Sequence, residues 1–273
     1  MATHPLVSIV VPSYVRSAQA LALLNETLTS VNAQTVQDFE VVVVDDGSPL
    51  DMRDAVRSHR NTVLVRQENA GCAQARNAGI ARATGRYFIF LDADDLLLPP
   101  AIEAGVAALE KHRECGFAVG PREEMTFEGS PVSWEVAPPP AQSYVYLSLL
   151  ASDWYILPPS CVMFRRETVE RVGGFRDPWG ADDLDFYLRA ARMHQAVCYP
   201  APSVTRYRRY STSSSRDGAR MLRSVRAVYA REWPHVAGNP EARSHAGEVR
   251  GSGFRDRVQS RGYGHSGNDA LQL

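Results

Sequence analysis

Four short apolar runs, each followed by a stretch with helical periodicity or by a turn, constrain the fold of this chain more than any other feature. The runs comprise residues 7–11, 40–44, 62–65 and 87–91. β-Branched and aromatic residues dominate them, and several are apolar at successive positions rather than at alternate ones. That pattern is typical of strands in a parallel sheet that is covered on both faces.

Helical patterns lie between and after these runs. Their apolar positions fall on one face of each helix: Leu21, Leu24, Leu28 and Val31 in the first, Ile102, Val106 and Leu109 in the second, and Leu184, Tyr187, Leu188 and Ala191 in the third. The second helix starts at Pro99 and Pro100, because proline is tolerated in a first turn. Alternating strands and helices predict an α/β fold with right-handed crossovers.

Composition excludes several classes of protein. Thirty Lys and Arg residues balance 31 Asp and Glu residues, for a net charge of −1, so we expect no nucleic-acid partner. The four cysteines are far apart and contain no C-x-x-C pair, which argues against a zinc site and a disulfide framework. No apolar stretch is long enough to span a bilayer, and residues 1–12 lack the features of a signal peptide. A cytoplasmic protein with reduced thiols is the expectation.

Polar residues follow three of the four predicted strands. They comprise residues 12–14, 45–48 and 92–95. Ligands of open α/β sheets bind beyond the carboxyl ends of the strands. Any one of these segments is also explained as an ordinary turn, since turns favour Asp, Gly and Ser. Three such strand ends together indicate a binding crevice.

The pair Asp92 and Asp94 predicts a metal site at this crevice. Carboxylate oxygens are hard ligands that suit Mg²⁺ or Mn²⁺, and such ions keep positions open for substrate phosphates. A divalent ion neutralises a diphosphate leaving group as a Lewis acid. The D-x-D pattern is short and common in loops, but here it directly follows an apolar strand.

Five segments together resemble the family-2 nucleotide-sugar glycosyltransferases of GT-A fold. They comprise residues 7–14, 39–48, 69–71, 75–79 and 85–95. The resemblance covers roughly residues 5–210. It implies a GT-A (Rossmann-like) fold, with a mixed, mostly parallel sheet flanked by helices. It also implies a metal-dependent inverting glycosyltransferase that moves a sugar from a nucleoside-diphosphate sugar (UDP, dTDP or GDP) to an acceptor hydroxyl, with Mn²⁺ or Mg²⁺ as cofactor.

The same resemblance implies roles for individual residues around the donor. These are Pro12 and Tyr14 at the nucleobase, Asp45 and Asp46 at the base or ribose, Arg76 at phosphate or sugar groups, Asp92 near the ribose and metal, and Asp94 as the main metal ligand. Val15 departs from the family, which often has Asn after the Tyr.

Asp182 and Asp183 resemble the family's acidic pair before a helix, which is more often Glu-Asp. The resemblance implies that Asp183 is the general base that draws the proton from the acceptor hydroxyl. An alternative for Asp182 is helix capping, since acidic residues suit a first helical turn. The two roles are compatible.

Further segments point to the acceptor side less specifically. Gly173 and Gly174 before Phe175 predict a tight turn, either near the acceptor or as an ordinary connection. Trp154 and Trp179 offer aromatic faces to a sugar, although packing alone is the favoured explanation for each. Tyr210 stands where a His is often expected as a further metal or phosphate contact, and Arg208 or Arg209 is the substitute that we consider.

The chain divides into three expected regions. A glycosyltransferase domain spans residues 1–210, with a donor half to about residue 98, an acceptor half from residue 99, and a surface excursion at 121–142. A basic helical extension follows at 211–238, and a poorly ordered tail at 239–273. Residues 206–232 carry eight arginines and two acidic residues. This segment either packs on the domain with a solvated basic face or contacts the inner face of a membrane peripherally.

Other functions explain the sequence less well. A nucleotidyltransferase usually has a glycine-rich basic loop after the first strand, whereas residues 12–16 contain no glycine. A glycosidase leaves the strand-end motifs unexplained. A catalytically inactive nucleotide-sugar-binding or assembly subunit is the remaining alternative, and the presence of Asp46, Asp94 and Asp183 argues against it. The acceptor stays open between a glycan, a lipid-linked glycan and a small molecule.

Overall fold

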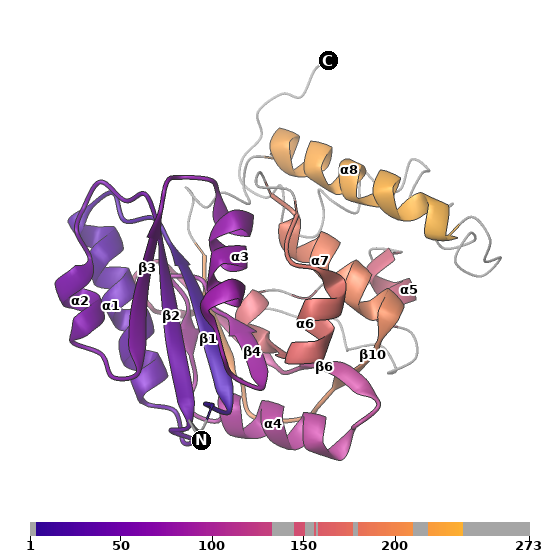
Figure 1. The fold of residues 1–273 in the computed structure, drawn as a ribbon, viewed down its shortest axis with the longest axis horizontal. Coiled ribbons are helices and arrows are strands. Elements are labelled where there is room, and N and C mark those ends of the chain that lie inside the picture. Colours follow the sequence, from indigo (N-terminus) through magenta and orange to yellow (C-terminus); the bar gives the residue numbers. More distant parts are fainter. Residues whose placement is uncertain are drawn as a thin grey trace.

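A computed structural model describes residues 4–132, 145–150, 156, 158–176, 180–209 and 218–236. Within these residues the fold is built on a seven-stranded sheet in the order β10-β6-β9-β4-β1-β2-β3 (Figure 1). Its strands are β1 (Val7–Ser13), β2 (Phe39–Asp46), β3 (Thr62–Gln67), β4 (Tyr87–Phe90), β6 (Cys115–Val119), β9 (Val162–Arg165) and β10 (Gln195–Cys198).

Six of these strands run in the same direction, and β9 runs antiparallel to its neighbours β4 and β6. The predicted mixed, mostly parallel sheet is therefore confirmed. Every residue of β1 is buried, as expected for a central strand covered on both faces. The four apolar runs form β1 to β4, although β1 and β2 extend two residues further than predicted and include Pro12, Asp45 and Asp46.

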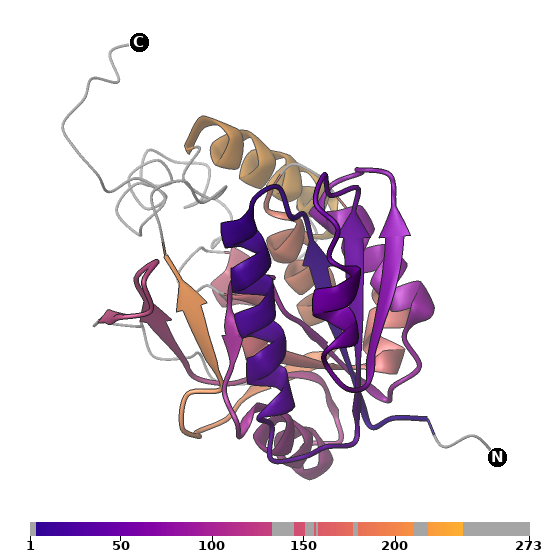
Figure 2. The same ribbon diagram turned by 90° about the vertical axis from the view of Figure 1, so that its left-hand side faces the viewer.

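Helices cover both faces of the sheet. On one face lie α1 (Ala18–Asn32) and α2 (Arg53–Arg57), and on the other lie α3 (Cys72–Arg82), α6 (Arg166–Val172) and α7 (Asp182–Met193) (Figures 1 and 2). Helix α3 packs very closely on β1, because a Cβ atom on Gly79 would lie 2.2 Å from Cγ1 of Val10. The glycine thus sets how near α3 comes to the central strand. Helix α4 (Ala101–Lys111) begins after Pro100, which is its N-cap rather than part of its first turn.

A second sheet has the order β5-β11-β7-β8. Its strands are β5 (Leu96–Leu97), β7 (Arg122–Met125), β8 (Pro131–Val132) and β11 (Thr205–Arg208). The surface excursion predicted at 121–142 contains two strands that the sequence did not indicate, because β7 pairs with β11 and β8 pairs with β7. The sequence signal was weak since β7 is mostly charged, and its partner β11 lies about 80 residues further along the chain.

Helix α8 (Gly218–Val236) packs against the domain through its apolar stripe. Met221, Val225 and Val228 are buried, while Arg223 and Arg226 are exposed. The Tyr146 hydroxyl of α5 (Val145–Leu150) donates a 2.8 Å hydrogen bond to the buried Glu232 carboxylate, which also pairs with Arg192 of α7. The described part of α8 therefore matches the packed alternative for the basic segment, and membrane contact stays a prediction.

All four cysteines are free thiols. None of the described helices combines the length and the apolar character needed to cross a membrane. The expected disordered tail at 239–273 lies outside the described residues. The division at residue 98 into donor and acceptor halves stays a prediction.

Glu40 closes a polar network at the amino-terminal end of the sheet. Its Oε1 atom accepts hydrogen bonds from the Ser8 hydroxyl at 2.7 Å and from the backbone N–H groups of Thr84 at 2.5 Å and Gly85 at 3.1 Å. Burial alone would raise the pKa of Glu40, but these hydrogen bonds outweigh it and hold that pKa below its usual value. The carboxylate thereby joins β2 to β1 and to the turn before β4.

We predict that Glu40→Ala lowers the free energy of unfolding by about 2 kcal/mol, because it leaves partly buried donors without an acceptor. Urea denaturation at pH 7 measures this. Since the folded-state pKa is lowered, the contribution is complete above the ordinary glutamate pKa and disappears as the pH falls through the lowered value. The difference in the free energy of unfolding between wild type and variant should therefore become smaller in acid. Glu170→Ala is the matched control, since the Glu170 side chain is exposed and its ion pair with Arg166 is long, at 3.6 Å.

Candidate active site

The structure brings the three polar strand ends together. Strands β4, β1 and β2 are direct neighbours, so their carboxyl ends open onto one edge of the sheet. Ser13 lies beside Asp45 in the register, and the Leu91 N–H donates a hydrogen bond to the Val10 carbonyl, which places Asp92 at the same edge. Pro12 is buried in the end of β1, whereas the Tyr14 side chain is 48% exposed.

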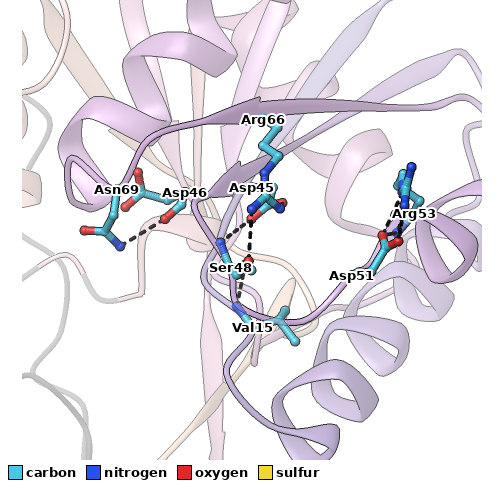
Figure 3. Close-up of polar contacts among 8 residues, drawn as sticks. All are labelled: Val15, Asp45, Asp46, Ser48, Asp51, Arg53, Arg66 and Asn69. Carbon is cyan, nitrogen blue, oxygen red and sulfur yellow. Dashed lines mark hydrogen bonds and ion pairs between the residues drawn. The ribbon is translucent and has the colours of Figure 1, made fainter.

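Asp45 stabilises the turn after β2 (Figure 3). Its Oδ1 atom accepts a 2.8 Å hydrogen bond from the Ser48 N–H, and its Oδ2 atom pairs with Arg66 of β3 at 2.5 Å. The Ser48 hydroxyl in turn accepts a hydrogen bond from the Val15 N–H. Both carboxylate oxygens of Asp45 therefore already bind protein groups, and the residue contributes to the site by fixing the turn after β2.

Asp46 holds the loop that leads into α3. Its Oδ1 atom accepts hydrogen bonds from the Gln67 side chain at 2.8 Å and the Ala70 N–H at 2.9 Å, and its Oδ2 atom accepts one from the Gly71 N–H at 2.9 Å. Asn69 donates to the Asp46 carbonyl (Figure 3). Asp46 thus satisfies backbone donors just before α3, as an N-cap would.

Arg76 joins the two acidic segments that the sequence placed at the site. Its Nη2 atom donates to Asp92 Oδ1 at 2.7 Å, and its Nη1 atom donates to Asp182 Oδ2 at 2.5 Å. The Arg76 side chain is only 5% exposed, against 30% for Asp92 and 12% for Asp182. Asp92 follows β4, and Asp182 begins α7, 90 residues further along the chain. The Arg76 guanidinium holds these two carboxylates close together.

Asp183 lies in the first turn of α7, where its Oδ1 atom accepts a 2.8 Å hydrogen bond from the Leu184 N–H. Burial, and next the negative charge of Asp182, raise the pKa of Asp183 to about 7. Burial is also the main reason that the pKa of Asp182 is raised, although Arg76 opposes it. The pKa of Asp183 is that of a group able to exchange a proton near neutral pH.

Asp182 is not the N-cap of α7. Ala181 occupies that position in a left-handed conformation, with φ of 55°, and makes no side-chain cap. The capping alternative for Asp182 was therefore wrong, because its carboxylate bonds Arg76 instead. The ion pair with Arg76 holds the first turn of α7 close to Asp92 at the end of β4.

Arg208 holds the segment around Asp94 from inside the protein. Its Nε atom donates to the Asp94 carbonyl at 2.9 Å, its backbone N–H donates to Asp95 Oδ1 at 2.9 Å, and its Nη2 atom donates to Glu26 at 2.6 Å. Arg208 is 4% exposed, and Arg209 pairs with the buried Glu124 at 3.0 Å. The guanidinium groups suggested for phosphate contact are therefore engaged with protein partners.

The acidic residues after β4 fit a divalent cation. Burial is the main cause that raises the pKa of Asp95 well above its usual value, and the negative charges of Asp94 and Asp92 add to it. No three His, Cys, Asp or Glu side chains form a metal-binding group among the described residues. Two carboxylates alone suit Mg²⁺ or Mn²⁺, because such ions take their other ligands from substrate oxygens and water.

Sequence patterns did not indicate the residues that hold the segment between α6 and α7. Asn77 exchanges two hydrogen bonds with the backbone of Phe175, and Arg189 donates to the carbonyls of Val172 and Gly174. Asn77 directly follows Arg76 in a segment that resembled the family, and Phe175 follows the glycine pair for which a tight turn was predicted. Three further candidates, Trp154, Trp179 and Tyr210, lie outside the described residues.

Comparisons with known proteins agree on one family. The family model for "Glycosyl transferase family 2" matches residues 8–173. An uncharacterised glycosyltransferase of Haemophilus influenzae is 30% identical over 233 residues, which cover 83% of this chain and 76% of that protein.

Solved structures show the same fold. S. aureus TarS in complex with UDP-GlcNAc matches with a TM-score of 0.70 and 18% identity, over 94% of this chain and 73% of that chain. The mannosyltransferase PcManGT from Pyrobaculum calidifontis, in complex with GDP-Man and Mn²⁺, matches with a TM-score of 0.60 and 23% identity, over 96% and 83%. The expected GT-A fold is confirmed.

We predict that Arg76→Met lowers the free energy of unfolding by about 3 kcal/mol, because it leaves two acidic groups near each other without their shared cation. Arg53→Met is the matched control. Arg53 also pairs with an aspartate at 2.5 Å, but both side chains are more than half exposed, so its loss should lower the free energy of unfolding far less than the loss of Arg76. Equal losses in chemical denaturation of the two variants would contradict a structural role for the Arg76 ion pairs.

Proposed function

This chain belongs to glycosyl transferase family 2 and is a glycosyltransferase, and we propose that it moves a sugar from a nucleoside-diphosphate sugar to an acceptor hydroxyl with inversion at the anomeric carbon. In this proposal the reaction depends on a divalent metal, and Asp183 is the general base. The observation that carries it is the ion-paired cluster in which Arg76 holds Asp92 of the donor side beside Asp182 of the acceptor side.

The division of labour within the acidic pair follows from their contacts. Asp182 is occupied by Arg76 at 2.5 Å, which stabilises its charged form but leaves it poorly placed to accept a proton. Asp183 accepts its hydrogen bond from the Leu184 N–H rather than from a cation, and its raised pKa matches a base that works near neutral pH. We therefore assign Asp183 to the acceptor hydroxyl, with Asp182 as the residue that orients it.

The donor fits the crevice beyond β4, β1 and β2. The exposed Tyr14 ring offers an aromatic face for a nucleobase at the end of β1, beside Pro12. The turn held by Asp45 and the loop held by Asp46 form the wall on the β2 side. The structural neighbours bind UDP-GlcNAc and GDP-Man, which supports a nucleotide-sugar donor without selecting UDP, dTDP or GDP.

Asp94 and Asp92 are the residues that would hold Mn²⁺ or Mg²⁺. The bound ion would supply positive charge to the departing diphosphate. Asp92 shares its carboxylate with Arg76, so it contributes to both the cation site and the ion-paired cluster. The Mn²⁺ in the PcManGT complex supports a divalent metal in this fold.

The alternative is a protein that binds nucleotide sugars but has lost turnover. The direct test is to incubate the purified chain with Mn²⁺ and a panel of nucleotide sugars and to measure release of nucleoside diphosphate. Release that depends on metal supports the enzyme, and an NMR assignment of the product anomer tests inversion. Binding without release would favour the inactive subunit, and neither binding nor release across the panel would contradict the donor assignment.

We predict that Asp183→Asn reduces transfer by roughly 100- to 10,000-fold while donor affinity is unchanged, because the variant removes the proton acceptor alone. In the wild type, kcat should fall on the acid side of a pH profile with an apparent pKa near 7, since protonated Asp183 is inactive. Asp54→Asn, an exposed aspartate in the first turn of α2, is the control. Undiminished transfer by Asp183→Asn would exclude Asp183 as the general base.

We predict that Asp94→Asn weakens donor binding in the presence of Mn²⁺ by at least about tenfold, because a metal ligand is lost. Isothermal titration calorimetry with and without EDTA measures this. Binding in EDTA should be equal for variant and wild type. The exposed Asp38→Asn is the control, and an unchanged metal-dependent affinity would exclude Asp94 as a ligand.

A further inference from the structure

The guanidinium of Arg76 lies against an aromatic ring as well as between two acids. Its Cζ atom is 5.2 Å from the centroid of the Phe175 ring. This distance is within the range of a cation–π contact. The Nε atom of Arg76 is buried and has no hydrogen-bond partner among the described residues. The hydrogen bonds to Asp92 and Asp182 therefore hold the two ends of the group, and no hydrogen bond holds its inner edge.

The Phe175 ring is fixed in turn by its neighbours. It stacks on Phe186 with ring centroids 4.2 Å apart and meets the edge of Phe90 at 4.7 Å. Its backbone is held at both polar atoms, because the Asn77 side chain donates to the Phe175 carbonyl at 2.9 Å and accepts from its N–H at 2.7 Å. Neither the ring nor its backbone is free to shift independently of α3.

The turn before Phe175 is also held in a fixed conformation. Gly173 and Gly174 have φ of 79° and 83°, which only glycine adopts without strain. A Cβ atom on Gly174 would lie 2.6 Å from Asn77 Oδ1, so a side chain there would displace the amide that holds Phe175. Arg189, itself paired with Asp185, donates to the carbonyls of Val172 at 2.6 Å and Gly174 at 2.8 Å. Arg189 thus ties the turn before Phe175 to α7, and the position of the Phe175 ring depends on that helix.

We propose that Phe175, held by Asn77 and Arg189, is a positioning residue for sugar transfer, because its ring fixes the plane of the Arg76 guanidinium between Asp92 and Asp182. This inference rests on the proposed function, in which those acids belong to the donor side and the acceptor side. Phe175 acts through Arg76 and does not itself touch the substrates. The ring sets the orientation in which the two substrates meet.

The first test compares Phe175→Leu with Phe117→Leu. Both variants remove a ring from the same aromatic core, but Phe117 stacks on Phe164 and has no cation–π contact with Arg76. Phe175→Leu should lower kcat by roughly 10- to 100-fold with little change in donor KM, since misplacement of reacting groups costs rate. Phe117→Leu should lower thermal stability without this loss of kcat. Equal losses of kcat in the two variants would overturn the proposal.

A second comparison asks whether Phe175 acts through Arg76. In an Arg76→Lys background, where the planar guanidinium is absent, Phe175→Leu should cost less than about threefold in kcat. Full additivity of the two losses would overturn the inference. If Phe175→Leu does not fold, Phe175→Met is used in its place in every comparison, because methionine keeps much of the side-chain volume but lacks the aromatic face.

NMR separates this inference from the proposed function. The Nε–H signal of Arg76, assigned by its disappearance in Arg76→Lys, should carry a ring-current shift that is lost in Phe175→Leu and kept in Phe117→Leu. An unchanged signal in Phe175→Leu would overturn the proposal whatever the activity. If the wild-type protein released no nucleotide from any donor, the proposed function would fail, and the NMR comparison would still decide whether Phe175 holds Arg76.

Discussion

The buried guanidinium of Arg76 is the interaction on which the site depends. One positive charge neutralises carboxylates from two distant segments, Asp92 after β4 and Asp182 at the start of α7. A buried ion pair is not in itself a strong source of stability, because desolvation opposes the Coulombic gain. Its value here is geometric, since a planar group with two fixed donors defines how far apart the two acids lie and how they face each other.

The same constraint explains the charge distribution of the chain. The overall charge of −1 conceals an acidic crevice, in which burial first and neighbouring carboxylates second raise the pKa values of Asp183 and Asp95. The protein tolerates this concentration because arginines engage the acids from the protein interior. Arg76 faces the crevice, and Arg208 holds the backbone around Asp94 from behind. In the proposed function, the carboxylates that these arginines leave uncompensated bind the divalent cation and accept the proton of the acceptor hydroxyl.

Much of the fold was accessible from the sequence, because apolar runs in a doubly covered sheet have a strong local signature. The runs predicted β1 to β4, and the motifs at their ends predicted that polar residues from β1, β2 and β4 meet at one edge of the sheet. Strands β7 and β8 were missed because their stability comes from pairing with β11 and with each other rather than from their own composition. The roles of Asn77, Phe175 and Arg189 were also inaccessible, since each depends on a contact between segments 15 to about 100 residues apart. The left-handed Ala181 before α7 gave no signal, because alanine has no preference for that conformation.

The close packing of α3 has a consequence for how such an enzyme diversifies. The loop held by Asp46 leads into α3, the same helix carries Arg76 and Asn77, and Gly79 presses it onto β1. Helix α3 therefore connects the loop that we propose as the wall of the nucleotide pocket to Arg76. We expect that a change that moves this loop also moves Arg76, so that donor choice and turnover change together. New specificity is more readily gained from segments that do not lead into α3, such as the exposed end of β1.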